Sequence, residues 1–255
     1  MRAVLAIARN TFREAVRDRI LYLFLGFAVI LIVSSKMFSM LTIGDETKVI
    51  KDLGLGAIQF FGMLISVMMS VLIVSREIEN RTVFNILAKP VRRWQFLLGK
   101  YIGLLEIIAL NIALMAVALV ALVFLYQLEF DPALLFAAAM TLLEMAVLSA
   151  FAVLFAVVSK PILGSVLTLA VFVVGHLTEA IWQLTARLGD PVSRFLVAAA
   201  YYLLPNLERF NFKTEVVHGL PVHPLVVVGA LVYAAVYVLL AMLLSWLQLQ
   251  RKDLV

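Results

Sequence analysis

The sequence predicts an all-α polytopic membrane protein with six transmembrane helices. Apolar residues make up 64% of its 255 residues and charged residues only 15%, whereas soluble domains are roughly half apolar and about a quarter charged. The apolar runs are continuous rather than alternating, which excludes a transmembrane barrel. Six runs reach the length of about 20 residues that crosses a bilayer. They are residues 20–41, 53–75, 96–125, 133–158, 161–184 and 225–249.

Lysine and arginine are shared unequally between the connections of these runs. Fourteen lie in the N-terminal segment, the second and fourth connections and the C-terminus, against six in the other connections. Because positively charged connections stay in the cytoplasm, both termini are expected to be cytoplasmic. No internal repeat or linker divides the chain, so residues 1–255 are expected to form one transmembrane domain.

Residues 1–19 are expected to form an amphipathic helix in the membrane interface. Arg9, Arg13 and Arg17 form a basic row at helical spacing, which suits anionic lipid headgroups. The apolar row consists of Leu5, Ala8, Phe12, Ala15 and Val16. We interpret this helix as an anchor that fixes the first span, and direct contact with a cytoplasmic partner is the alternative.

The connection 76–95 between the second and third runs is too polar to cross a bilayer and too patterned for a plain loop. Val83, Ile86 and Leu87 give it a short apolar helical face. Pro90 ends that helix, because a proline disfavours helical geometry in the residue before it. A basic loop that lies on the membrane is the alternative interpretation.

This connection resembles the signature of type-2 ABC exporter permeases, including the subgroup linked to multicopper-enzyme maturation. An acidic start is followed by a threonine, a leucine-containing turn, Pro-Val-x-Arg and Leu-Gly-Lys. The matching residues are Glu77, Glu79, Thr82, Leu87, Pro90, Val91, Arg93, Leu98, Gly99 and Lys100. The family often has Gly-Thr where this chain has Arg81-Thr82, so the local turn is expected to differ. The six-run layout and the N-terminal helix also resemble the family.

The resemblance implies the membrane subunit of an ATP-driven exporter in a prokaryotic plasma membrane. Such subunits pair, usually as a homodimer, with two ATPase subunits that bind ATP and Mg²⁺. An accessory protein is a further candidate partner, and no nucleic acid is expected. Each permease copy docks a coupling helix, here at about residues 82–89, into an ATPase. The resemblance assigns ATPase coupling to Glu77, Glu79, Arg81, Thr82, Phe84, Leu87, Pro90, Arg92 and Arg93.

Two glycines and a lysine at the start of the third run invite two different interpretations. Gly99 and Gly103 form a G-x-x-x-G motif, which allows a neighbouring helix to approach closely. Gly99-Lys100 is the only Gly-Lys pair, but Tyr101 follows it and Trp94 replaces the first glycine of a P-loop. The chain is therefore not expected to hydrolyse ATP, and the ATPase is expected to be a separate chain.

Polar side chains within the apolar runs are costly and are candidates for function. The candidates for a substrate path or gate are Glu106, Asn111, Glu144, His176 and Glu179. Glu144 lies deepest, and a carboxyl that only supports packing is its alternative role. His176 is expected to be a satisfied histidine of the bundle rather than a metal ligand.

Two further expectations concern the outer half of the membrane and the outer surface. Lys36 lies at a depth similar to that of Glu179, so we expect it to pair with Glu179 or with the C-terminal end of the run 161–184. Outward snorkelling of the lysine is the alternative. The outward-facing residues 185–224 contain an apolar stretch at 192–205 that is too short to cross. We expect this segment to be interfacial or re-entrant.

A secondary carrier or channel is the alternative function, and an intramembrane enzyme is a third candidate. A carrier would favour inverted repeats, and an enzyme would need a motif such as H-E-x-x-H or G-x-S-x-G; the sequence has none of these. With no cysteine and three histidines, no metal site or other cofactor is expected. The few charges within the runs favour a hydrophobic or amphipathic cargo.

Overall fold

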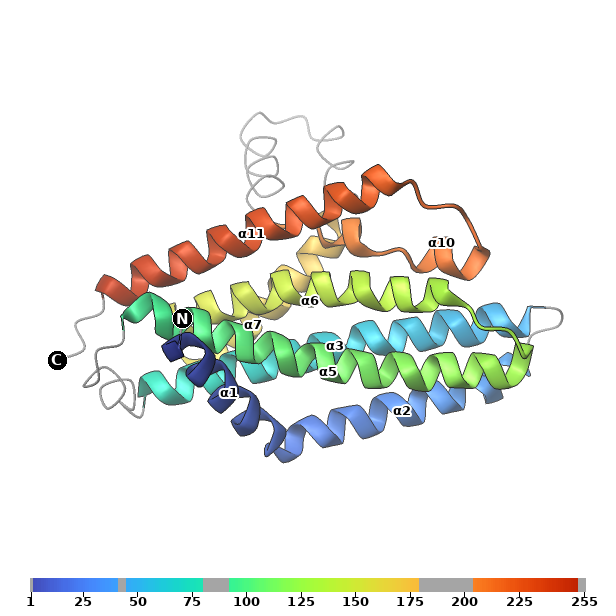
Figure 1. Cartoon of the computed structure of the whole chain (residues 1–255), viewed down its shortest axis with the longest axis horizontal. Coiled ribbons are helices and arrows are strands. Elements are labelled where there is room, and N and C mark those ends of the chain that lie inside the picture. Colours follow the sequence, from blue (N-terminus) through green and yellow to red (C-terminus); the bar gives the residue numbers. More distant parts are fainter. Residues whose placement is uncertain (1, 41–44, 80–91, 179–203, 252–255) are drawn as a thin grey trace, which may run out of the picture.

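The protein is an all-helical bundle in its computed structural model, which describes residues 2–40, 45–79, 92–178 and 204–251 (Figure 1). The described residues contain no strand. The helices are α1 (Arg2–Val16), α2 (Arg19–Ser39), α3 (Glu46–Glu79), α5 (Arg93–Gln127), α6 (Pro132–Val158), α7 (Pro161–His176), the 3₁₀ turn η1 (Leu207–Phe210), α10 (Lys213–His218) and α11 (Pro224–Arg251).

Five of these helices, α2, α3, α5, α6 and α11, are long and apolar enough to cross a membrane. They confirm the predicted polytopic all-α fold. The remaining predicted span, 161–184, which is the fifth along the chain, begins as the shorter apolar helix α7 of 16 residues. At 1.5 Å per residue α7 rises about 24 Å, less than the hydrocarbon thickness of roughly 30 Å. Residues 179–184 of that span lie outside the described residues.

Helix α3 forms the centre of the bundle and packs against α2, α5, α6 and α7. In its apolar stretch 78% of the residues are buried, compared with 22% in α2 and 17% in α11. Helix α11 packs along α6 through the small residues Ala230, Ala234 and Ala241, which permit close approach of the two helices. The outer faces of α2 and α11 are apolar and exposed, as expected for helices that face lipid.

The start of the chain and the end of α11 lie at the same end of the bundle, here called the terminal end (Figure 1). One Nη of Arg93, in the first turn of α5, donates to the carbonyl oxygens of Leu249 at 2.6 Å and Gln250 at 3.0 Å. A cation at these unpaired carbonyls stabilises a helix C-terminus. The opposite end, here called the distal end, contains the start of α3, the α5–α6 connection and the α10–α11 connection.

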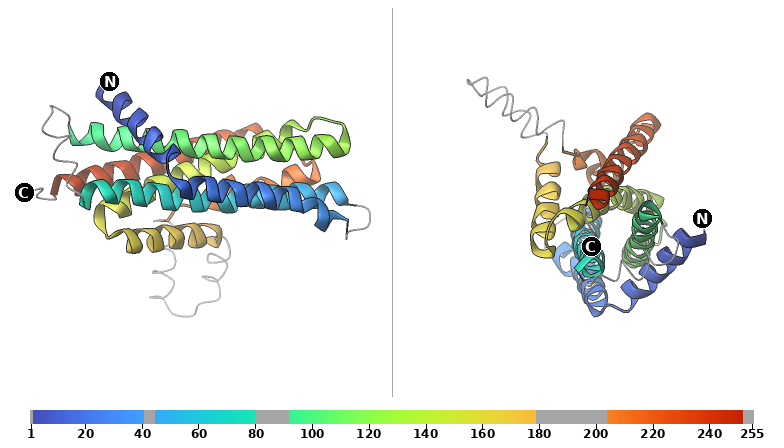
Figure 2. Two further views of the ribbon diagram at one scale, coloured as in Figure 1. Left: turned by 90° about the horizontal axis from the view of Figure 1, so that it is seen from below. Right: turned by 90° about the vertical axis from the view of Figure 1, so that its left-hand side faces the viewer.

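Helix α1 crosses the first turns of α5 obliquely at the terminal end (Figure 2). A Cβ added to Gly99 would lie 2.7 Å from Cβ of Ile7, and one added to Gly103 would lie 2.5 Å from the carbonyl oxygen of Ala8. The close approach predicted from the G-x-x-x-G motif is therefore confirmed. The neighbour is α1, rather than another long helix.

The buried row of α1 differs from the predicted apolar row. The structure buries Val4, Ala8, Thr11 and Ala15, whereas the side chain of Leu5 is 64% exposed. One residue corresponds to a rotation of about 100° around a helix, so Leu5 lies beside the surface that packs on α5. Contact of α1 with lipid headgroups stays a prediction.

A valine in place of Gly103 should displace α1. The side chain would meet the backbone of α1, and overpacking of this kind costs about 2 kcal/mol in the free energy of unfolding. Because the chain has no cysteine, a Thr11→Cys variant can report the displacement through its rate of reaction with a maleimide. We expect slow labelling in that parent and fast labelling after Gly103→Val. Gly26→Val is the matched control, since nothing lies within 4 Å of a Cβ at Gly26; equal labelling in both would contradict the packing.

Candidate functional site

A buried ion cluster joins three helices at the terminal end. Lys100 of α5 is only 1% exposed, and its Nζ lies 2.6 Å from Oε1 of Glu77 on α3 and 3.4 Å from Oε2 of Glu14 on α1. Breaking a buried pair leaves an uncompensated charge in the interior. The Lys100 cluster therefore holds α1, α3 and α5 in a fixed relation.

The Lys100 cluster lies near the end of α3 and the start of α5, the two helices that flank the predicted coupling helix in the sequence. Helix α3 ends at Glu79 and α5 begins at Arg93. A weaker contact nearby joins Arg76 of α3 to Asp18, the N-cap of α2, at 3.7 Å. Ion pairs at this end of the bundle therefore connect α3 with α1, α2 and α5.

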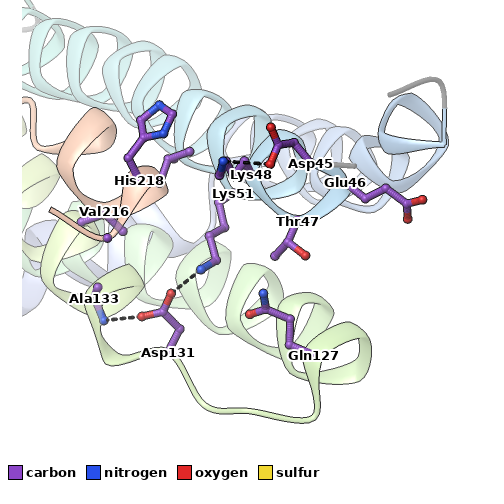
Figure 3. A pocket seen from close by; sticks show the side chains of 12 residues that line it. Asp45, Glu46, Thr47, Lys48, Lys51, Gln127, Asp131, Ala133, Val216 and His218 are labelled. Carbon is purple, nitrogen blue, oxygen red and sulfur yellow. Dashed lines mark hydrogen bonds and ion pairs between the residues drawn. The ribbon is translucent and has the colours of Figure 1, made fainter. Parts of the chain in front are cut away.

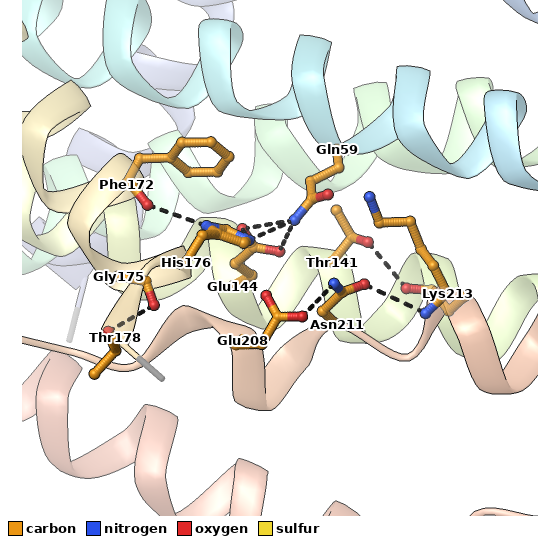
Figure 4. Close-up of polar contacts among 11 residues, drawn as sticks. Gln59, Thr141, Glu144, Phe172, Gly175, His176, Thr178, Glu208, Asn211 and Lys213 are labelled. Carbon is orange, nitrogen blue, oxygen red and sulfur yellow. Dashed lines mark hydrogen bonds and ion pairs between the residues drawn. The ribbon is translucent and has the colours of Figure 1, made fainter. Parts of the chain in front are cut away.

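A second polar cluster lies inside the bundle (Figure 4). Gln59 of α3 donates from Nε2 to both carboxylate oxygens of Glu144 on α6, at 3.1 and 3.0 Å. The same nitrogen lies 2.8 Å from Nε2 of His176 on α7. Glu144 is only 1% exposed. One amide group therefore bridges three helices at a position where no bulk water competes.

The hydrogen bonds indicate which nitrogen of His176 carries a proton. Its Nδ1 lies 3.0 Å from the carbonyl oxygen of Phe172, so Nδ1 donates there. With Nδ1 as the donor, Nε2 accepts from the amide of Gln59. Oε1 of Glu144 lies 3.3 Å from the same Nε2, so the ring contacts both other members of the cluster.

The segment 204–218 packs against this Gln59–Glu144–His176 cluster (Figure 4). Leu207 and Phe210 are fully buried, and a Cβ on Gly175 of α7 would lie 2.7 Å from Cγ of Leu207. The hydroxyl of Tyr233 on α11 accepts from the backbone N–H of Asn206 at 2.7 Å. These contacts hold residues 204–218 against the bundle, and the re-entrant or interfacial placement of 185–224 stays a prediction.

Charged residues of the same segment act on the cluster. Lys213 and Glu208 are close enough to Glu144 for Coulombic interaction with its carboxyl group. Glu208 also accepts from the Asn211 side-chain amide at 2.7 Å. The cluster is thus linked electrostatically to the part of the chain that leads to the distal end.

The sequence model of the ABC-2 family transporter proteins matches residues 5–254, which is nearly the whole chain. The chain belongs to this family. It is therefore the membrane-spanning permease of an ABC transporter, and the family implies an ATPase partner. A search of curated proteins finds no match.

The structure places some of the permease residues that were predicted to couple to an ATPase. Glu77 faces the interior and contacts Lys100, whereas Arg92 is exposed at the start of α5. Arg93 binds the end of α11. Glu79 lies in the last turn of α3. The remaining residues, Arg81, Thr82, Phe84, Leu87 and Pro90, lie outside the described residues, and their role stays a prediction.

The predicted substrate-path residues are only partly brought together. Glu144 and His176 meet, but Glu106 is exposed on α5, away from the cluster. Asn111 is buried and donates to the carbonyl oxygen of Ile107 in its own helix at 2.9 Å. Glu179, together with its proposed pairing, lies outside the described residues. The ammonium of Lys36 lies 4.8 Å from the centre of the Tyr126 ring, a favourable cation–π contact.

Gln59 is the central member of the cluster that the sequence interpretation missed. Gln59 is the lone amide of the second apolar run. It carries no charge, so it stands out less in the sequence than the ionisable residues of the other runs. A buried amide also needs hydrogen-bond partners in an apolar medium. That requirement, applied to every polar side chain of the runs, would have found it.

A polar pocket of about 550 Å³ opens at the distal end of the permease (Figure 3). Lys51 of α3 lies 2.6 Å from Oδ2 of Asp131, and Lys48 lies 2.8 Å from Oδ1 of Asp45. Asp131 is also the N-cap of α6 and accepts from the N–H of Ala133 at 3.0 Å. The start of α3 is thereby fixed to the start of α6.

Proposed function

We propose that the permease is one half of an ATP-driven exporter. Two copies pair as a homodimer in a prokaryotic plasma membrane, with both termini in the cytoplasm. Two separate ATPase subunits bind ATP and Mg²⁺ and dock on the coupling segment 76–95. Family membership and the concentration of basic residues in the predicted cytoplasmic connections support this arrangement.

The Lys100 cluster gives this proposal its strongest structural support. It braces α1, α3 and α5 on both sides of the coupling segment, so a push from an ATPase would move them as one body. Packed helices shift between discrete arrangements rather than deforming continuously. A short movement at the terminal end would therefore displace α3 as a rigid body, including the part of α3 that lies inside the bundle.

Helix α3 connects the coupling segment with the interior polar cluster. Gln59 and Glu77 lie on this one helix, about 27 Å apart at 1.5 Å per residue. A tilt or slide of α3 would pull Gln59 away from Glu144 and His176. In our proposal the three residues form a latch that holds the inserted segment 204–218 closed until the ATPases move α3.

Purification from the native host in mild detergent tests the proposed function. We expect an ATPase with a Walker motif to co-purify in equal amount with the permease, and the complex to hydrolyse ATP. The comparison is a permease with Arg92→Glu and Pro90→Ala in the docking segment. This variant should fold, but the ATPase should no longer co-purify with it. A homogeneous permease without any ATPase, active in transport, would instead favour a secondary carrier or channel.

A further inference from the structure

An apolar groove of about 590 Å³ lies beside the polar pocket at the distal end. Its walls come from the start of α6, from α10 and from the start of α11. The residues that matter here are Phe136, Val222 and Val227. Leu225 and Val228 next to them are exposed, at 73% and 54%, on a helix face that the fold assigns to lipid. A hydrocarbon chain could therefore enter the groove sideways from the bilayer.

One wall of this apolar groove carries a carboxylate. Glu215 of α10 lines the groove, and its Oε2 is buried with no hydrogen-bond partner among the described residues. An anionic oxygen without a partner in a low-dielectric site is costly. A positively charged group in the groove would be attracted to this carboxylate and would offset its charge, whereas an anionic group would be repelled.

The polar pocket adjoins the groove, and each lysine among the described residues that line it is already paired. Ala133, Val216 and Gly219 line both cavities, so the two communicate around the turn after α10. Lys48 and Lys51 are already paired with aspartates. Glu46 is an additional exposed carboxylate on the wall of the pocket, which leaves an acidic excess at this end of a protein whose net charge is +5.

We propose that the distal end binds a cationic amphiphile, with its hydrocarbon chain in the apolar groove and its ammonium group beside Glu215. The ammonium would face the adjoining acidic pocket, and the chain would lie against Phe136 and Val227. Binding at this site does not depend on an ATPase. That the bound amphiphile is the cargo of the transporter rests on the proposed function.

Photoaffinity labelling of the full-length permease in dodecyl maltoside tests the site. The probe is a trimethylammonium with a dodecyl chain that carries a diazirine near its end, and mass spectrometry maps the labelled peptides. We expect label on the peptides that contain Phe136 and Val227. Unlabelled dodecyltrimethylammonium should compete, while dodecanoate, with the same chain type and opposite charge, should not.

Two pairs of variants test separately the binding of the ammonium group and the binding of the hydrocarbon chain. Glu215→Gln should lower labelling about tenfold, since it removes the negative charge on the wall of the groove, and Glu129→Gln, an exposed carboxylate at the same end, should not. Val227→Trp should fill the groove and block labelling, whereas Leu240→Trp, on the exposed face of the same helix, should not.

Three results would overturn the proposal: labelling that Glu215→Gln leaves unchanged, competition by dodecanoate as strong as by the ammonium, or label spread evenly along α11. Because the assay needs no ATPase, loss of the ATPase partner and loss of this site are separate outcomes. With the ATPase present, stimulation of hydrolysis by dodecyltrimethylammonium would identify the amphiphile class as cargo, and its absence would restrict the site to binding.

Discussion

Replacement of Lys100 by methionine is expected to lower the free energy of unfolding of the permease by about 4 kcal/mol, because the breaking of a buried ion pair leaves an uncompensated charge. Glu77 would lose the Lys100 contact at 2.6 Å, and Glu14 would lose the one at 3.4 Å. Methionine has a similar length and is apolar, so the loss reports the charge rather than a cavity. Chemical or thermal unfolding in detergent would measure it.

A second substitution shows whether the penalty comes from the carboxylate that remains. In Lys100→Met/Glu77→Leu, most of the lost stability should return, since an apolar pair of similar volume replaces a buried ion pair at little cost. Lys160→Met is the matched control, because this lysine is exposed in the α6–α7 connection. Equal free energies of unfolding for Lys100→Met and Lys160→Met would contradict the claim that the Lys100 cluster holds α1, α3 and α5 together.

Leucine in place of Gln59 is expected to cost about 3 kcal/mol, since the buried carboxylate of Glu144 would lose its amide donor. The latch between α3, α6 and α7 would open, and segment 204–218 would become loosely held. A Leu207→Cys variant, buried in the parent, should then react with maleimide much faster. Gln127→Leu, an exposed glutamine of α5, should change neither the stability nor the labelling.

A double-mutant cycle identifies the coupling between Gln59 and Glu144. Removal of both polar groups in Gln59→Leu/Glu144→Leu should cost less than the sum of the two single changes, since no unpaired group is left behind. We expect an interaction of about 2 kcal/mol between the two positions. Strict additivity would mean that the two side chains do not act together.

The architecture was largely predictable because it depends on hydrophobicity and length. Five of the six predicted spans are long apolar helices in the structure. Of the remaining span, 161–184, the structure describes helix α7 up to His176, and residues 179–184 lie outside the described residues. The start of α7 at Pro161 matches the prediction, since a proline at the first helical position is favourable.

The partners of individual side chains were less predictable than the helices. The sequence identified Glu144 and His176 as separate candidates, but it did not reveal Gln59 as the residue that joins them. Lys100 was interpreted as part of a loop signature, whereas it is almost fully buried. Which faces of two helices meet depends on their rotation in the bundle, and a single sequence does not specify that rotation.

The G-x-x-x-G motif illustrates the same limit. The sequence predicted a close neighbour for Gly99 and Gly103, and the structure has one. The identity of that neighbour, α1, follows only from the oblique course of the chain across α5 (Figure 2). The N-terminal helix is therefore part of the brace at the terminal end, in addition to its predicted place at the membrane surface.

Cross-linking within the purified transporter tests the central claim most directly, namely that a separate ATPase drives the permease through the coupling segment. A single cysteine at Leu87 can be introduced without interference, because the chain has none, and Glu129→Cys at the distal end is its control. We predict that a short bifunctional maleimide joins position 87, and not position 129, to an ATPase subunit. Cross-links from position 129 alone, or a transporter without any ATPase, would contradict this account.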